Sequence, residues 1–474
     1  MRILHAIHDF LPRHQAGSEI YVSELCRELA RAHHVTVLCA EYDPSRRHGH
    51  VQWRVHNGLA VVEIVNNWVC RTFEDTYRPP LIGDRIADVL RAVQPDIVHV
   101  HNLLNLSFDL PAMAHAQGIP VVATLHDYAL VCPSGGQRIH RADRHICHVI
   151  DTGRCARCFG ESPVHAHIAY GQIAAAIRAP GLVHRTAVAT RRRLPALVER
   201  ATALARRAAS VATTTEDVDK RLAAARRLFD QIDLFVAPSR SIAGEFERLG
   251  VKADRIRISD YGFADSGRGA AVRPSLEYDA HDGFKRHRPL RIGYVGTLVW
   301  HKGVHVLLEA IRSLQPEAYE LRIFGNPDVF PDYTADLRAL AAGLPVHFLG
   351  AFARERTAEV YAQIDLLVVP SLWLENSPLV IHEAFVAGVP VVAARIGGIV
   401  DLVDDGRTGR LYDSTSAGEL AAVLRQLIGD RDQLRTMTSL ARTAPVKSIG
   451  DDAREWEERY AAVLGSRAAV GRAT

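Results

Sequence analysis

Two glutamates, Glu375 and Glu383, lie eight positions apart in the stretch WLENSPLVIHEAF, with a Ser-Pro pair between them. Ser377 is a good helix cap and Pro378 suits the first helical position, so we expect a helix from about 378 to 387. The free N–H groups and the dipole at a helix start favour an anion. Carboxylates beside such a site suit a ligand that also carries hydroxyl groups. The stretch therefore predicts a nucleotide-sugar pocket, with two ordinary surface glutamates as the alternative.

The strands and helices that position this stretch are predicted by alternating β-rich and helical patterns. They run through residues 1–165 and restart near Pro289. Such alternation predicts an α/β fold with two doubly wound, Rossmann-like units in tandem. Ligands of such sheets lie at the carboxyl ends of the strands, so we expect a site in a central cleft.

Composition shifts give the expected domain boundaries. The segment 265–288 is polar and rich in Gly, Pro and charge, which predicts a linker. The predicted parts are an N-terminal acceptor-side domain over 1–264, a C-terminal donor-binding domain over 289–448, and a last helix over 449–474 that crosses back to the first domain.

The overall composition is that of a globular protein. The chain has 474 residues, 48% of them hydrophobic and 23% charged, with a net charge of +3. This mild balance gives no reason to expect nucleic acid as a partner. The N-terminus lacks the features of a secretory signal and no long apolar run occurs, so we expect a cytoplasmic protein. The chain lacks G-x-G-x-x-G, which counts against a dinucleotide-dependent oxidoreductase.

Several segments together resemble one enzyme family. They include HQAGSEIYVSELCRELA, ATLHDY, DLFVAPSRSIAGEFERLGV, GYVGTLVWHKGVHVLLEA, RIFG, FLGAF and the E-x7-E block. This set is similar to the retaining glycosyltransferases of family 4, which have the GT-B fold. The resemblance covers most of the chain and implies transfer of a sugar from a nucleotide-sugar to an acceptor hydroxyl, without a metal in catalysis.

The resemblance assigns roles in the C-terminal half. It implies that Glu383 accepts hydrogen bonds from the donor ribose and that Glu375 lies against the transferred sugar. Lys302, in WHKG, matches a lysine that neutralises the leaving diphosphate, although a solvated lysine is the alternative. The expected donor-binding residues beside these are Gly296, Thr297, Asn376, Ser377 and Leu379.

One position departs from the family pattern. Members often carry Arg directly after the glycine that here is Gly296, but this chain has Thr297. The site is therefore one positive charge short, and His301 or Arg240 is a candidate to compensate.

The N-terminal half contributes fewer candidates. Gly17 permits close backbone approach and Ser18 is expected to cap the following helix, whose start would meet the diphosphate. A plain tight turn is the alternative. His126 ends the strand of PVVATLHD, and the resemblance implies that it orients the transferring sugar without acting as a covalent nucleophile.

Four cysteines cluster after this strand, spaced C-x14-C-x7-C-x2-C: Cys132, Cys147, Cys155 and Cys158. Four thiolates complete a closed tetrahedral zinc site, so a structural zinc is one interpretation. Separate buried thiols and oxidisable cysteines are the others. Nearby histidines offer replacement ligands: His140, His145 and His148.

An Ala- and Arg-rich segment over 165–230 predicts a basic helical insert. It could contact the anionic inner face of a membrane, or consist of solvated helices, which the small apolar residues favour. The expected partners are thus a nucleotide-sugar such as a UDP- or GDP-sugar and a glycan or lipid-linked acceptor, in polysaccharide or glycolipid synthesis. An epimerase or hydrolase of the same fold, or an inactive GT-B binding module, stays open as an alternative function.

Overall fold

The computed structural model describes residues 1–162, 164–176, 211–264, 277–279 and 285–470, together with residues 185, 186, 189, 190, 193 and 200. Most of the predicted linker and much of the predicted basic insert lie outside these residues. The chain divides into a first unit, formed by Met1–Pro238, Ile242–Ser259 and Ile449–Thr474, and a second unit, formed by Ser239–Ser241 and Asp260–Ser448. The predicted first domain ends at residue 264, whereas the long segment of the second unit begins at Asp260.

The first unit is built on an eight-stranded sheet. In spatial order its strands are β10 (Ile256–Ile258), β9 (Leu234–Ala237), β6 (Val121–Thr124), β5 (Ile97–Val100), β1 (Arg2–Ile7), β2 (His34–Glu41), β4 (Leu59–Val65) and β3 (Val51–His56). All neighbours are parallel except β3 and β4. The helices described around it include α1 (Gly17–Leu29), α2 (Pro80–Val93), α3 (Leu110–His115), α8 (Thr215–Asp230) and α9 (Arg240–Arg248).

The second unit is built on a six-stranded parallel sheet. Its order is β15 (Val346–Gly350), β14 (Tyr319–Phe324), β13 (Leu290–Val295), β16 (Leu366–Val369), β17 (Val391–Ala394) and β18 (Gly409–Tyr412). A short hairpin of β11 (Glu277–Asp279) and β12 (Lys285–His287) precedes it. Two parallel sheets of this kind confirm the predicted α/β class with two Rossmann-like units.

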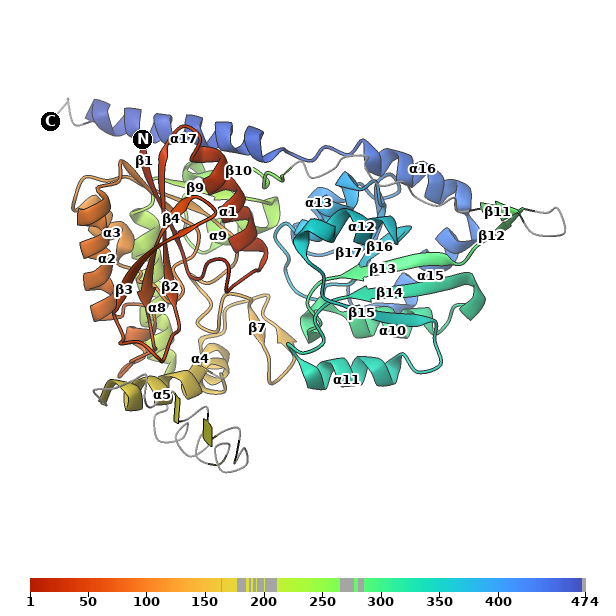
Figure 1. The fold of residues 1–474 in the computed structure, drawn as a ribbon, viewed down its shortest axis with the longest axis horizontal. Helices are drawn as coiled ribbons and strands as arrows, with labels where there is room; N and C mark the ends of the chain where they lie inside the picture. Colours follow the sequence, from red (N-terminus) through yellow and green to blue (C-terminus); the bar gives the residue numbers. More distant parts are fainter. Residues whose placement is uncertain are drawn as a thin grey trace. The chain divides into compact units, whose positions relative to one another are not determined.

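Alternating residues give the second sheet a core on each face. Leu366 and Val368 join one buried cluster, and Leu367 and Val369 join the other. Helices α10 (Val304–Ile311), α11 (Pro331–Leu340) and α15 (Ala417–Gly429) cover the first face, as Figure 1 shows. Helices α12 (Thr357–Ala362), α13 (Leu379–Val386) and α14 (Ile399–Leu402) pack into the other core, and α16 (Arg431–Arg442) contributes to both.

The last helix, α17 (Ile449–Val470), belongs to the first unit and lies beside α1 (Figure 1). The Tyr21 hydroxyl donates to Asp452 at 2.8 Å and accepts from the Trp456 indole at 3.2 Å. The rings of Trp456 and His99 are 4.1 Å apart between centroids. In the described part of the chain, no helix has the length and apolar character needed to cross a membrane.

Replacing Trp456 by Ala tests how strongly α17 holds to the first unit. The indole is only 1% exposed, so its loss should lower the free energy of unfolding by about 3–5 kcal/mol, measured by urea denaturation. Arg454→Ala is the matched control on the same helix, because this side chain is 71% exposed. Its effect should stay within about 0.5 kcal/mol. Equal effects of the two substitutions would contradict a packed α17.

Candidate functional site

Three loops meet at the carboxyl ends of β13, β16 and β17 in the second unit. Glycines allow their close approach: Gly303 has a φ of 71°, and a Cβ there would lie 1.7 Å from the carbonyl oxygen of Pro370. A Cβ at Gly398 would lie 1.6 Å from the carbonyl oxygen of Asn376. The Gly398 N–H also donates to the Glu375 carbonyl at 2.6 Å. Side chains larger than hydrogen at these positions would push the loops apart.

A buried ion pair joins two of these loops. Lys302 ends the short helix after β13 and donates to Glu375 Oε1 at 2.6 Å. The Ser371 hydroxyl donates to the same oxygen at 2.6 Å. The Lys302 ammonium also lies 5.2 Å from the centroid of the Trp373 ring. The structure thus brings together Lys302 and Glu375, which are 73 residues apart in sequence.

The pair fixes the charge of Glu375. Burial by itself would raise the pKa of this carboxyl, but the Lys302 charge and the hydrogen bonds from Lys302 and Ser371 bring the pKa below its usual range. The Glu375 side chain is 6% exposed, whereas that of Lys302 is 28% exposed. A carboxylate therefore persists in a nearly dry setting, while its cationic partner stays accessible to a ligand.

Glu383 lies on α13, the helix that follows this loop. Its Oε2 accepts from the Tyr361 hydroxyl at 3.0 Å, and its Oε1 lies 3.6 Å from a guanidinium nitrogen of Arg354. The side chain is 17% exposed, so one edge of the carboxylate meets solvent. Sequence reasoning missed Tyr361 and Arg354, because they come from α12 and from a short 3-10 helix before it, elsewhere in the chain.

The predicted start of this helix needs correction. Helix α13 begins at Leu379 with Pro378 as its N-cap residue, and no side chain caps it. Ser377 does not cap the helix, because its hydroxyl donates to Asp260 at 2.6 Å and lies 2.9 Å from Nε2 of His382. The helix start therefore keeps backbone N–H groups without a side-chain cap, which is the condition for an anion site.

The loop after β13 places the remaining donor-side residues. Gly296 has a φ of 150°, and its N–H donates to the Phe324 carbonyl at 3.0 Å. Thr297 is exposed, and its carbonyl accepts from the Tyr294 hydroxyl at 2.8 Å. His301 is buried, with its ring against Trp373. Arg240 instead contacts Asp401 at 3.2 Å.

In the first unit, helix α1 starts at Gly17, and here too the predicted cap is wrong. Ala16 is the N-cap residue, and its N–H donates to Glu19 Oε2 at 3.0 Å, so Glu19 and not Ser18 satisfies the helix start. Glu19 Oε1 lies 3.2 Å from Nε2 of His8. Gly17 is exposed and Ser18 is half-buried.

His126 is the last member of a row of three imidazoles. Its Nε2 lies 2.9 Å from Nδ1 of His101, and Nε2 of His101 lies 2.9 Å from Nδ1 of His5. Burial lowers the pKa of His5 and of His126 to about 3 and that of His101 well below its usual value, so all three rings are neutral. Each neutral ring has one N–H, so the tautomer of His126 is coupled to those of the two rings behind it.

Two members of this row, His5 and His101, also form a group of potential metal ligands with His99 in the described part of the chain. Donor atoms of His5, His99 and His101 lie within 4.8 Å of one another. Hydrogen bonds already use both ring nitrogens of His99 and His101 and Nδ1 of His5, since His99 also lies 2.7 Å from the Tyr460 hydroxyl and 2.8 Å from the Thr124 hydroxyl. The arrangement is therefore a hydrogen-bonded support for His126.

Asp127 is a further polar residue at the end of β6. Burial raises its pKa to about 6, against the hydrogen bonds from the Ala129 N–H at 2.7 Å and the Asn102 amide at 2.8 Å. Its only sequence signal is its position after His126. A carboxyl with this pKa can hold or release a proton near neutral pH.

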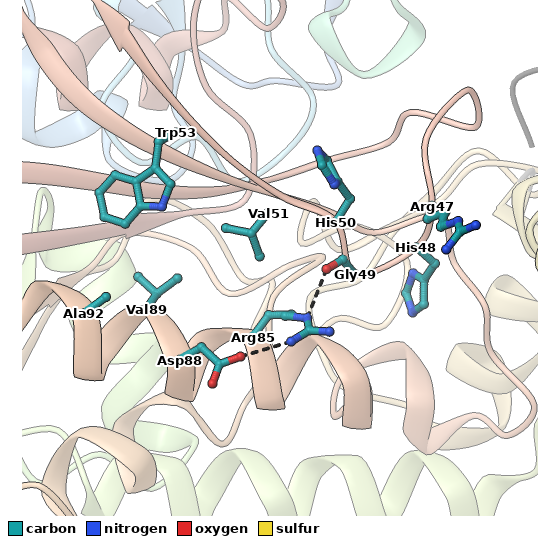
Figure 2. Close-up of a pocket in the computed structure, with 10 residues that line it drawn as sticks. All are labelled: Arg47, His48, Gly49, His50, Val51, Trp53, Arg85, Asp88, Val89 and Ala92. Carbon is teal, nitrogen blue, oxygen red and sulfur yellow. Dashed lines mark hydrogen bonds and ion pairs between the residues drawn. The ribbon is translucent and has the colours of Figure 1, made fainter.

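The four clustered cysteines line one small cavity in the first unit, and none of them forms a disulfide. A larger cavity of about 510 Å³ lies elsewhere in the same unit, between β3 and α2. Figure 2 shows its lining, in which Arg85 donates to the Gly49 carbonyl and to Asp88; Trp53 also lines the cavity. No predicted site residue lines this larger cavity, so it is separate from the candidate site.

His5→Asn tests the row of neutral imidazoles. A histidine whose pKa is lowered from 6.5 to about 3 stabilises the fold above pH 6.5 and loses that contribution as pH falls toward 3. The Asn amide can replace Nδ1 toward His101 but does not titrate. Urea denaturation between pH 6 and 4.5 should show that the free energy of unfolding of the variant falls less steeply with pH than that of the wild type, by up to about 1.4 kcal/mol per pH unit.

His50→Asn is the control, because His50 is exposed and should leave this slope unchanged. A slope for His5→Asn equal to that of the wild type would contradict a buried, neutral His5.

A model described as "Glycosyltransferase Family 4" matches residues 16–162, and one described as "Glycosyl transferases group 1" matches residues 279–444. Sulfoquinovosyl transferase SQD2 of Arabidopsis thaliana is 30% identical over 50% of this chain and 43% of its own length. A D-inositol 3-phosphate glycosyltransferase of Nocardia farcinica is 33% identical over 52% of this chain and 57% of its own length. The chain thus spans about half the length of these curated relatives.

Solved structures match over nearly the whole chain. Sucrose-phosphate synthase from Thermosynechococcus elongatus has a TM-score of 0.64 at 17% identity, covering 98% of this chain and 99% of its own. Anabaena HepE in complex with UDP and glucose has a TM-score of 0.60 at 16% identity, covering 97% and 99%. At this identity the likeness shows the fold. Together with the two family matches, it shows that the chain belongs to the family 4 glycosyltransferases with the GT-B fold.

Proposed function

We propose that this chain transfers a sugar from a nucleoside-diphosphate sugar to an acceptor hydroxyl, with retention of the anomeric configuration. The observation that carries the proposal is the accessible Lys302 ammonium, held by the buried carboxylate of Glu375 at the carboxyl end of β13 and β16. A diphosphate leaving group develops negative charge as the glycosidic bond breaks, and a fixed cation stabilises that charge. The uncapped start of α13 adds backbone N–H groups.

The other donor-site residues of the second unit bind the transferred sugar, the ribose and the diphosphate. Glu383, with one carboxylate edge in solvent, accepts hydrogen bonds from the ribose hydroxyls. Glu375 and the backbone of Asn376 to Leu379 lie against the transferred sugar. Gly296 and Thr297 line the diphosphate. In this proposal the protein supplies the positive charge, so catalysis needs no metal ion.

The first unit orients the sugar and supplies the acceptor. His126 contributes a neutral imidazole of fixed tautomer, which suits a hydrogen bond to a sugar hydroxyl. Gly17 and Ser18, at the start of α1, take part in diphosphate binding. The acceptor in this proposal is a glycan or a lipid-linked sugar, and a relative named for amylovoran biosynthesis, 29% identical over 42% of this chain, supports the glycan. We place the reaction in the cytoplasm, with contact of the basic segment 165–230 at the inner membrane face as a further proposal.

Calorimetric titration with UDP, GDP, ADP and dTDP tests the donor site. The panel includes the nucleotides of solved neighbours, which were crystallised with UDP or ADP. One nucleotide should bind the wild type, and Glu383→Ala should weaken it by about 1–3 kcal/mol because the ribose loses its acceptor. Glu359→Ala is the control, since this glutamate lies on neighbouring α12 and is 62% exposed. Equal binding to wild type and Glu383→Ala would contradict the ribose role.

The matching nucleotide-sugar then separates the alternatives. A transferase should release the nucleotide only when an acceptor is present, and the new linkage should keep the donor's anomeric configuration. Turnover without an acceptor would indicate a hydrolase or epimerase of the same fold. Failure of every nucleotide to bind would favour a non-catalytic module.

A further inference from the structure

The four clustered cysteines come from three separate segments of the first unit. Cys132 lies in the loop after β6, and Cys147 follows β8 (His145–Ile146), which pairs with β7 (Ile139–His140). Cys155 and Cys158 lie one turn apart on α4 (Thr152–Gly160), so they share a face of that helix. Together the segments converge on a single point.

That point is a small cavity lined by all four thiols. Its volume is about 20 Å³, which admits an occupant no larger than one water molecule or one ion. The rest of the lining is largely apolar and includes Val131, Pro133, Ile139, Val149 and Ile150. A cavity of this size excludes a multi-iron cluster and suits a single ion.

The nearby histidine His140 does not compete for this position. Its Nδ1 lies 2.9 Å from Asp143 and its Nε2 lies 2.7 Å from Glu161, so carboxylates engage both ring nitrogens. Neither His145 nor His148 lines the cavity, so the zinc-type ligands in its lining are the four thiols, beside the Ser134 hydroxyl.

Positive charge surrounds the cavity. Arg138 and Arg154 line it, and within the described residues the buried Nε atom of each has no hydrogen-bond partner. Arg221 is buried and donates to the carbonyls of Ala129 and Leu130, just before Cys132. A zinc ion with four thiolates carries a net charge of –2, and the guanidinium groups that line the cavity offset part of that charge, although Arg138 is also paired with Glu245.

We propose that Cys132, Cys147, Cys155 and Cys158 bind one structural Zn²⁺ ion. Four thiols release four protons and form four Zn–S bonds, with no change in oxidation state. Tetrahedral Zn–S bonds of about 2.3 Å place the sulfurs about 3.8 Å apart. No three of these sulfurs lie within 4.8 Å of one another in the described structure, so zinc binding requires the three segments to move closer together.

The zinc stabilises the loop behind the candidate site. This loop begins directly after Asp127, and the Tyr128 N–H donates to the Gly136 carbonyl at 2.9 Å. A Cβ at Gly136 would lie 3.0 Å from the Asp127 carboxyl carbon. Fixing Cys132 to α4 therefore holds the segment that packs against Asp127.

Metal content of the full chain, purified from zinc-supplemented culture, tests the proposal. Mass spectrometry of the metal should give about one zinc per chain in the wild type. The zinc content per chain of the Cys155→Ser/Cys158→Ser double variant should be at least about tenfold lower than that of the wild type. Cys70→Ser is the control, because Cys70 is buried in the same unit but does not line the cavity, and it should retain the metal.

Two measurements on the wild type keep the test valid if the double variant misfolds. Replacing zinc by Co²⁺ should give the visible bands of a tetrahedral all-thiolate site, and a strong chelator should lower the melting temperature. Four results would each overturn the proposal. They are a wild type that stays free of zinc after incubation with zinc, a double variant that retains zinc, a disulfide between the clustered cysteines, and iron with sulfide in the purified protein.

Discussion

The ion pair between Lys302 and Glu375 is the interaction on which the candidate donor site depends. Removing one partner of a nearly buried pair leaves an uncompensated charge, at a cost of about 3–5 kcal/mol. The glycines at 303 and 398 bring the neighbouring loops close enough for this pair to form. Lys302 is partly exposed and the start of α13 has no side-chain cap, so both are sources of positive potential in the proposed donor site.

The candidate residues of the two units differ in charge. The second unit keeps Glu375 ionised beside a cation, whereas the first unit keeps the row of His5, His101 and His126 neutral by burial. A fixed charge suits a leaving diphosphate, and neutral imidazoles suit the hydroxyl groups of a sugar. Acid pH should therefore weaken the first unit before it discharges Glu375, because the histidines begin to accept protons on unfolding below pH 6.5.

Sequence reasoning predicted the parts that local patterns encode. Buried parallel strands such as β13 and β16 read as apolar runs, and the positions of Lys302 and Glu383 followed from recognisable motifs. The predicted helix caps were wrong. Ser377 donates to Asp260, 117 residues away, and Glu19 instead of Ser18 accepts from the backbone at the start of α1. Edge strand β3 gives no apolar run because its residues are exposed or half-buried. The histidine row was missed because it joins His5 on β1 to His101 and His126, which follow β5 and β6.

The central claim is that Lys302 faces the diphosphate of the donor. Its most direct test is to titrate Lys302→Met and the wild type with the preferred nucleoside diphosphate and with the same nucleoside lacking phosphate. The account predicts that the variant binds the diphosphate at least about tenfold more weakly, a loss of about 1.4 kcal/mol. Nucleoside binding should stay unchanged, which also shows that the variant is folded. Unchanged diphosphate binding, or an equal loss for both ligands, would contradict the account.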